Sequence, residues 1–266
     1  MRKLFKPLFA IAAAGCLVAS CSREDMTENK AELSQETLSK ISALGFSVAD
    51  VQVVDGNYLV EGDILLSPSD LDQKPTSPRL RIAEVEQYHT FNLVTGTPRT
   101  ITVTTSGSNI TTGLSNAINN AIARYNAENL GLTFVRGGSS GGGNINIRVV
   151  NTNQYIASAG FPSNGNPYNS ISYAKRYNNY SDGFMTTVIA HEMGHCIGFR
   201  HTDYMNRAYS CGSGGNEGQE TSGVGAVNIP GTPTGPDAGS WMLACLSSTT
   251  NRPFNDNDKV ALNYLY

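Results

Sequence analysis

The chain is poor in charge, histidine and cysteine for its length of 266 residues. Charged side chains make up 15% of it and the net charge is −3, so the sequence offers no basic patch for nucleic acid. No cysteine lies between residues 22 and 195, which excludes a thiolate metal ligand from that segment. The glycine-rich stretch at 137–143 contains no lysine and lies between two predicted strands, which excludes a phosphate-binding loop.

Three of the four histidines lie in one short stretch, HEMGHCIGFRHTDY at residues 191–204. The apolar residues before it are typical of a buried helix. If that helix continues through the stretch, side chains four residues apart share a face, so His191 and His195 form a two-point metal clamp. Glu192 then places its carboxylate beside the metal, where an attacking water would lie.

Gly198 can adopt a positive φ, so it can end this helix and return His201 to the metal as a third ligand. Three neutral imidazoles that leave a fourth position for water are typical of catalytic zinc, whereas structural zinc is usually closed by four ligands rich in cysteine. A bare H-E-x-x-H occurs by chance, but this match fixes five positions. The stretch therefore predicts one Zn²⁺ ion and hydrolytic chemistry.

These five positions, H-E-x-x-H-x-x-G-x-x-H, resemble the metzincin clan of zinc endopeptidases, whose motif is followed by a methionine turn. Met242 in DAGSWMLACL resembles that turn, which implies that it packs beneath the imidazoles without binding zinc. An ordinary core methionine is the alternative. With HEMGHCIGFRHTDY and GSWMLACL, the chain from about residue 40 to its end resembles the bacterial dual-action HEIGH metallopeptidase family. The resemblance implies protein or peptide substrates and Glu192 as general base.

The resemblance also implies an α+β, metzincin-like (zincin) fold at residues 96–266. Its expected parts are a mixed twisted sheet, a backing helix, the zinc-binding helix and a C-terminal helix in NDNDKVALNYLY. The strand before the zinc helix would lie at the sheet edge and pair with an extended substrate. Astacin-type enzymes carry a tyrosine two residues after the turn methionine, where this chain has Ala244, so Tyr204 and Tyr209 are the remaining candidates for an oxyanion stabiliser.

The residue pattern itself predicts an order of elements for this domain. Alternation predicts a strand at residues 99–106, and apolar spacing predicts a helix that begins near residue 109 and ends at Gly131. Residues 153–170, rich in Asn, Pro and Gly, are expected to form a loop. Further strands are predicted at residues 132–137, 144–150 and 171–175.

Residues 1–20 have the pattern of an export signal, with a basic start and an apolar run too short and interrupted to span a membrane. VASC at residues 18–21 resembles a bacterial lipobox, which implies that Cys21 becomes the lipid-bearing first residue. A plain secretory signal is the alternative. The protein is therefore expected to be exported and anchored through lipid to a bacterial membrane, with the cell surface as one destination.

Three cysteines remain in the mature body, so at most one intramolecular disulfide can form among them. Cys196 lies in the metal helix, where a buried thiol would pack as a small apolar group. Cys211 and Cys245 flank a long irregular segment, and a bridge between them would restrict the unfolded chain. That pairing is preferred, although spacing leaves a bond from Cys196 to either partner open.

Residues 21–95 are expected to form a tether and a small pro-like segment. Two β-branched runs around Asp55-Gly56-Asn57 predict a hairpin. YLVEGDILLS resembles the F-x-G-D stretch of astacin pro-segments, which implies that Asp63 takes the zinc position reserved for water, although Val60 replaces the aromatic residue. A hairpin strand with a bulge is the alternative. Candidate processing points are the basic residues of a proline-containing linker region, Arg79, Arg81 and Arg99.

Residues 205–240 are rich in glycine and are expected either to line one side of the cleft or to form a surface insertion. Asp203 is expected either to orient His201 or to lie at the surface. The loops rich in Gly, Asn and Asp leave Ca²⁺ open as a second ion, and the oligomeric state is open.

Two functions fit the sequence. One is a zinc endopeptidase made as a zymogen; the other is a surface binding or adhesion lipoprotein with a latent or inactive form of the same fold. Glu192 favours the first, because a structural zinc site has no need of that carboxylate.

Overall fold

The structure is a computed structural model that describes residues 33–72, 87–214, 225–233 and 235–266. Residues 33–266 belong to one compact unit. The predicted export signal, the predicted lipidation at Cys21 and the candidate processing points Arg79 and Arg81 lie outside the described residues.

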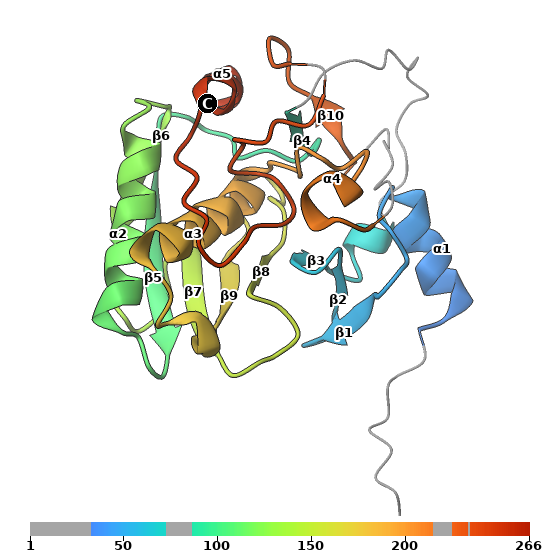
Figure 1. The fold of residues 1–266 in the computed structure, drawn as a ribbon, viewed down its shortest axis with the longest axis horizontal. Coiled ribbons are helices and arrows are strands. Elements are labelled where there is room, and N and C mark those ends of the chain that lie inside the picture. The colour runs from blue at the N-terminus through green and yellow to red at the C-terminus, as the bar shows by residue number, and fades with distance from the viewer. Residues whose placement is uncertain (1–32, 73–86, 215–224, 234) are drawn as a thin grey trace, which may run out of the picture. The chain divides into compact units, whose positions relative to one another are not determined.

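The described residues form an α+β fold around a mixed eight-stranded sheet, as expected, with the order β1-β2-β3-β8-β9-β7-β5-β6 (Figure 1). The strands β6, β5, β7 and β9 run parallel to one another, whereas β8 runs antiparallel to β9. The strand bounds are β1 Gln52–Val54, β2 Asn57–Val60, β3 Ile64–Leu66, β5 Arg99–Gly107, β6 Leu132–Arg136, β7 Ile145–Val150, β8 Ala157–Ala159 and β9 Ser170–Ala174.

Two long helices pack against each other on one face of this sheet, α2 at Thr112–Asn126 and α3 at Asp182–Ile197 (Figure 1). The α2 side chains at helical spacing are buried in the main core, which is why the apolar pattern found this helix. It ends at Asn126 and not at Gly131, because the chain turns at residues 127–131 and the Gly131 N–H donates to the Tyr266 carbonyl instead of an α2 carbonyl.

The α3 helix is buried on nearly every side. The Ser181 side chain caps its start by accepting from the Phe184 N–H at 3.3 Å. Gly198 ends it with φ of 112°, a conformation that suits glycine because it has no Cβ. A Cβ there would also lie 2.9 Å from the Asn92 carbonyl oxygen. The helix and its sharp end therefore follow from local sequence.

The strand order corrects two expectations. The short strand β8 lies in the segment 153–170 that was expected to be a loop. The strand before α3, β9, is not at the sheet edge because β8 separates it from the edge. The outer side of β8 is in turn occupied by β3, with Ile64 opposite Ala159 and a bond of 2.9 Å from the Ala159 N–H to the Asp63 carbonyl.

The N-terminal segment contains α1 at Gln35–Ala43, strands β1 to β3 and a 3₁₀ turn at Asp70–Asp72. The predicted hairpin is present between β1 and β2, with Asp55 at φ 49° and Gly56 at φ 78°. The segment has its own apolar core, into which Phe161 from the end of β8 also packs.

Residues 87–94 pack with the part of the chain that was expected to begin at residue 96. Strand β4 at Tyr88–His89 pairs with β10 at Val227–Asn228, and Val94 lies in the main core. Arg99 is the first residue of β5 and bonds the Gly165 carbonyl at 2.8 Å, so it is an unsuitable processing point.

The C-terminal helix expected from NDNDKVALNYLY is α5, Asp256–Leu265, which begins with a capping box made by Asn255 and Asp258. One further short helix, α4, covers Ala208–Cys211. Among the described residues, none of the helices has the length and apolar character needed to cross a membrane.

Candidate metal centre

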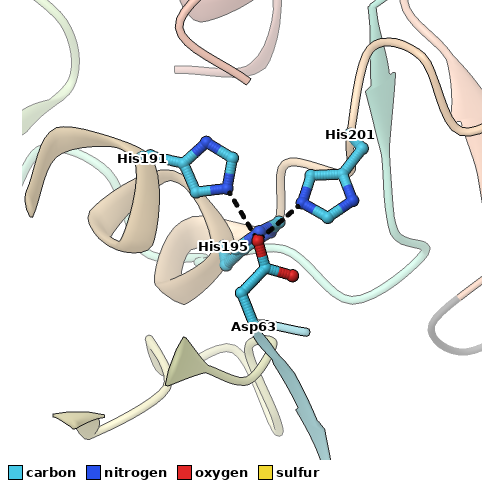
Figure 2. Close-up of side chains that lie close together, drawn as sticks. All are labelled: Asp63, His191, His195 and His201. Carbon is cyan, nitrogen blue, oxygen red and sulfur yellow. Dashed lines mark hydrogen bonds and ion pairs between the residues drawn. The ribbon is translucent and has the colours of Figure 1, made fainter. Parts of the chain in front are cut away.

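The three motif histidines meet in one buried volume (Figure 2). His191 and His195 project from the same face of α3, and His201 returns to them after the turn at Gly198. Their ring centroids lie 4.7 Å (His191 to His195), 4.9 Å (His195 to His201) and 5.3 Å (His191 to His201) apart. All three side chains are buried.

Backbone carbonyls fix which ring nitrogen of two histidines carries the proton. The Nδ1 atom of His191 lies 2.9 Å from the Trp241 carbonyl oxygen, and that of His195 lies 2.8 Å from the Phe199 carbonyl oxygen. A carbonyl only accepts, so each Nδ1 donates a proton and each Nε2 keeps a lone pair toward the centre of the cluster. Burial and the neighbouring imidazoles lower the pKa of His195 well below its usual range, which keeps that ring neutral.

The predicted methionine turn lies beneath the metal helix. Met242 is fully buried, and its backbone carbonyl accepts from the Thr202 N–H at 2.9 Å, beside the third histidine. A Cβ placed on Gly194 of α3 would lie only 2.6 Å from the Met242 sulfur. Glycine at 194 therefore allows the helix to rest directly on the turn, and the Trp241 carbonyl of the same turn orients His191.

Asp63 reaches the three histidines from the N-terminal segment. Its Oδ2 lies 3.2 Å from His201 Nε2 and 3.5 Å from His191 Nε2. The residue stands in a turn between β2 and β3, and Glu61 and Gly62 before it have φ of 58° and 93°. The left-handed conformation is uncommon for glutamate, so the turn is held by its surroundings.

The charge on Asp63 is stabilised by the cluster. Burial opposes its ionisation, but the neighbouring imidazoles, His201 first and then His191, outweigh burial and hold the pKa of Asp63 well below its usual range. The carboxylate therefore faces the histidines as an anion.

These four residues fit a metal ion. One ligand atom from each lies within 4.8 Å of the others. The Nε2 atoms of His191 and His195 and the Oδ1 of Asp63 are buried and have no hydrogen-bond partner among the described residues. Buried polar atoms that converge without partners are costly unless an ion binds them. Three imidazoles and a carboxylate are a donor set of borderline and hard ligands suited to a divalent metal.

A sequence comparison identifies the family. The profile of the dual-action HEIGH metallopeptidases matches residues 59–266, which include all four cluster residues. The chain belongs to this metallopeptidase family. No curated protein sequence matches the chain.

Two solved structures of myroilysin are similar to this metallopeptidase at low identity. One is 16% identical, with a TM-score of 0.46, and covers 66% of this chain and 96% of the other. The second is also 16% identical, with a TM-score of 0.40, and covers 64% of this chain and 83% of the other.

Glu192 of the metallopeptidase lies beside the metal centre, where the motif predicts it. It is 3% exposed and its Oε2 has no hydrogen-bond partner among the described residues. Burial, and secondly the charge on Asp63, raise the pKa of Glu192 well above its usual range. A carboxyl group with a raised pKa can both accept and return a proton near neutral pH.

A cavity of about 290 Å³ opens beside Glu192 and His191. It lies between the β8 side of the sheet and the segment after the methionine turn, and Arg207 contributes to its wall. Among the described residues of 205–240, Arg207 lines this cavity. The Arg207 guanidinium also donates to the Glu61 carbonyl at 2.6 Å.

The tyrosines on the cavity wall are Tyr155 and Tyr177, which sequence reasoning did not single out. Tyr204 is instead buried against Tyr88, with ring centroids 4.1 Å apart, and Tyr209 is 46% exposed. Neither Tyr204 nor Tyr209 lines this cavity.

Asp203 is fully buried and not at the surface. Its Oδ1 accepts from the Ala244 N–H at 3.0 Å, and its Oδ2 accepts from Ser210 Oγ. It therefore ties the loop after His201 to the chain that follows the methionine turn, and this fixes two walls of the site relative to each other.

A disulfide joins Cys211 to Cys245 across this same region, and Cys196 is a buried free thiol. Burial raises the pKa of the Cys196 thiol well above its usual range. That side chain lies in the main core, as expected for a small apolar group.

Proposed function

We propose that this metallopeptidase is a zinc endopeptidase whose N-terminal segment keeps it latent. One observation carries the proposal: two histidines with their tautomers set by carbonyls, a third histidine and Asp63 converge on one point beside a buried glutamate. His191, His195 and His201 would hold Zn²⁺, with Asp63 as a fourth ligand in the latent chain. A metzincin-type fold is part of this proposal.

Zn²⁺ supplies an electrophile that polarises the scissile carbonyl and lowers the pKa of water. Glu192 takes the proton of the attacking water and passes it to the leaving amine. The raised pKa of Glu192 suits both steps. The carbonyls of Trp241 and Phe199 hold the His191 and His195 rings in place throughout.

The edge of β8 is the proposed docking line for substrate. An extended peptide can add to a strand edge through main-chain hydrogen bonds. In the full chain β3 takes that edge beside Ala159, and Asp63, the residue directly before β3, reaches the metal centre. Substrate and N-terminal segment would therefore exclude each other.

Further contacts hold the N-terminal segment in place. Arg148 of β7 pairs with Asp55 at 2.7 Å, and Arg207 bonds the Glu61 backbone. We propose that release requires a cut between the segment and Gln87, where the described catalytic part begins. This replaces the boundary after residue 95, because residues 87–94 pack in the catalytic part.

We also propose that the protein is an exported lipoprotein, from the signal and lipobox patterns of the sequence alone.

The test uses the chain from residue 22, purified whole with Zn²⁺ and carrying an inserted site for a specific protease between residues 73 and 86. Casein cleavage is measured before and after nicking and removal of the released segment. Activity that appears only after nicking, and is lost in Glu192→Gln with zinc still bound, supports the proposal. Glu128→Gln is the matched control and should keep the activity. Absence of cleavage in the nicked, zinc-loaded wild type would favour the binding or adhesion lipoprotein.

A further inference from the structure

An arginine beside the metal ligands is covered by an aromatic ring from the N-terminal segment. Arg200 directly precedes His201 and is fully buried. Its guanidinium carbon lies 4.1 Å from the centroid of the Phe46 ring and 5.9 Å from that of Phe161. The two phenylalanine rings are stacked, with centroids 6.4 Å apart and an interplanar angle of 27°. Phe46 therefore sits on a platform made by Arg200 and Phe161.

The platform belongs to the catalytic part and adjoins its reacting centre. Phe161 stands two residues after Ala159 on β8, and its ring meets the His195 imidazole edge to face at 5.5 Å. The backbone N–H of Arg200 donates a hydrogen bond of 2.8 Å to the Tyr88 carbonyl. A peptide lying along the β8 edge would therefore pass over both side chains.

Phe46 comes from a different part of the chain and leaves with the N-terminal segment. Its departure uncovers one face of the Arg200 guanidinium and one face of the Phe161 ring. An exposed arginine beside an aromatic ring attracts a further aromatic ring through cation–π and stacking interactions. Phe46 is thus an occupant supplied by the chain itself, and its aromatic ring indicates that the surface of Arg200 and Phe161 accepts aromatic side chains.

We propose that, in the released enzyme, Arg200 and Phe161 form a subsite for an aromatic side chain of the substrate, in the place that Phe46 holds in the latent chain. The proposal rests on the proposed function, and it adds a specificity-determining pair that acts on substrate choice. The selectivity arises because an aliphatic side chain gains no cation–π attraction.

The test uses the whole chain nicked as above, and one peptide scaffold with Phe, Tyr, Leu, Glu or Lys at one position at a time. At one position, Phe and Tyr peptides should have kcat/KM about five- to tenfold above the Leu peptide, from typical cation–π and ring-pair strengths. Arg200→Gln and Phe161→Leu should each bring that ratio close to one. Arg124→Gln, an arginine on α2 that bonds the Arg252 backbone, should leave the ratio unchanged.

Binding of the same peptides to the nicked Glu192→Gln enzyme gives a second readout that needs no turnover. The Kd ratio of Leu to Phe peptide should again be about five to ten and should collapse with Arg200→Gln. Equal Kd values for Phe and Leu peptides at every position would overturn the subsite, even if casein is cleaved. A preference for Phe over Leu peptides that persists in both Arg200→Gln and Phe161→Leu would overturn it as well. An enzyme that binds Phe peptides selectively but cuts nothing would keep the subsite and refute the endopeptidase.

Discussion

Gly194 on the metal helix is a position where one added methyl group should disturb both the fold and the metal centre. A Cβ there would lie 2.6 Å from the Met242 sulfur and 3.1 Å from Trp241 Nε1, whereas ordinary carbon contacts are about 3.5–4.0 Å. Overpacking of this kind costs about 1–3 kcal/mol. Replacing a helical glycine by alanine returns about 1 kcal/mol. Gly194→Ala should therefore lower the free energy of unfolding by up to about 2 kcal/mol and weaken zinc binding, because Trp241 orients His191.

The matched control is Gly113→Ala on α2, where the closest atom to the new Cβ would be the flexible end of Met185 at 3.3 Å and the other neighbours lie at an ordinary 3.9 Å. It gains the same helix propensity without the clash, so it should be neutral or stabilising. Urea unfolding followed by circular dichroism, with zinc content measured on the same samples, compares the two variants. The double variant Gly194→Ala/Met242→Ala should recover part of the lost free energy of unfolding, because the clashing sulfur is gone. If Gly194→Ala is as stable and as zinc-rich as Gly113→Ala, Met242 does not support the helix.

Three other predictions concern stability and export. Burial raises the pKa of Asp258 to about 6 from 3.8, so the folded state binds its proton more tightly than the unfolded state. The free energy of unfolding should therefore fall by about 2 kcal/mol as pH rises from 4 to 6. Urea unfolding across this range should lose that slope in Asp258→Asn, and an unchanged slope would contradict the assignment. Reducing the Cys211–Cys245 bond, which spans 34 residues, should cost about 4 kcal/mol of unfolding free energy, whereas equal urea midpoints with and without reductant would argue against it. Cys21→Ala should abolish incorporation of a labelled fatty acid during expression, and labelling that persists would refute the lipobox.

The metal ligands were predictable because the chemistry is encoded locally. His191, Glu192 and His195 depend only on helical spacing, and His201 needs only the turn that Gly198 permits. The hairpin at Asp55-Gly56 also follows from local pattern, because both residues need positive φ. Met242 and the C-terminal helix were expected only from the family resemblance, and α5 is present.

The features that the sequence did not predict depend on contacts between distant segments of the chain. Strand β8 has three residues and no alternation long enough to detect, so the edge position that the family resemblance implied for β9 had no sequence signal against it. Arg200 lies inside the motif, but an arginine is usually exposed, so the sequence alone does not predict its burial. Its contact with Phe46 is visible only in the structure. Asp203 lacks a sequence signal for burial because its partners, such as the Ala244 N–H, belong to another loop.

In the proposed latent form, the pairing of β3 with β8 would make inhibition depend on concentration. While both strands belong to one chain, β3 is present at the β8 edge at an effective concentration on the order of millimolar. Free peptides at lower concentration therefore compete poorly with β3 for that edge. A single backbone cut changes no contact at the edge, yet it turns the same association into a bimolecular one. Inhibition then weakens on dilution, and every peptide that occupies β8 shifts the equilibrium further toward release. An enzyme regulated in this way would activate most readily where it is dilute and substrate is abundant.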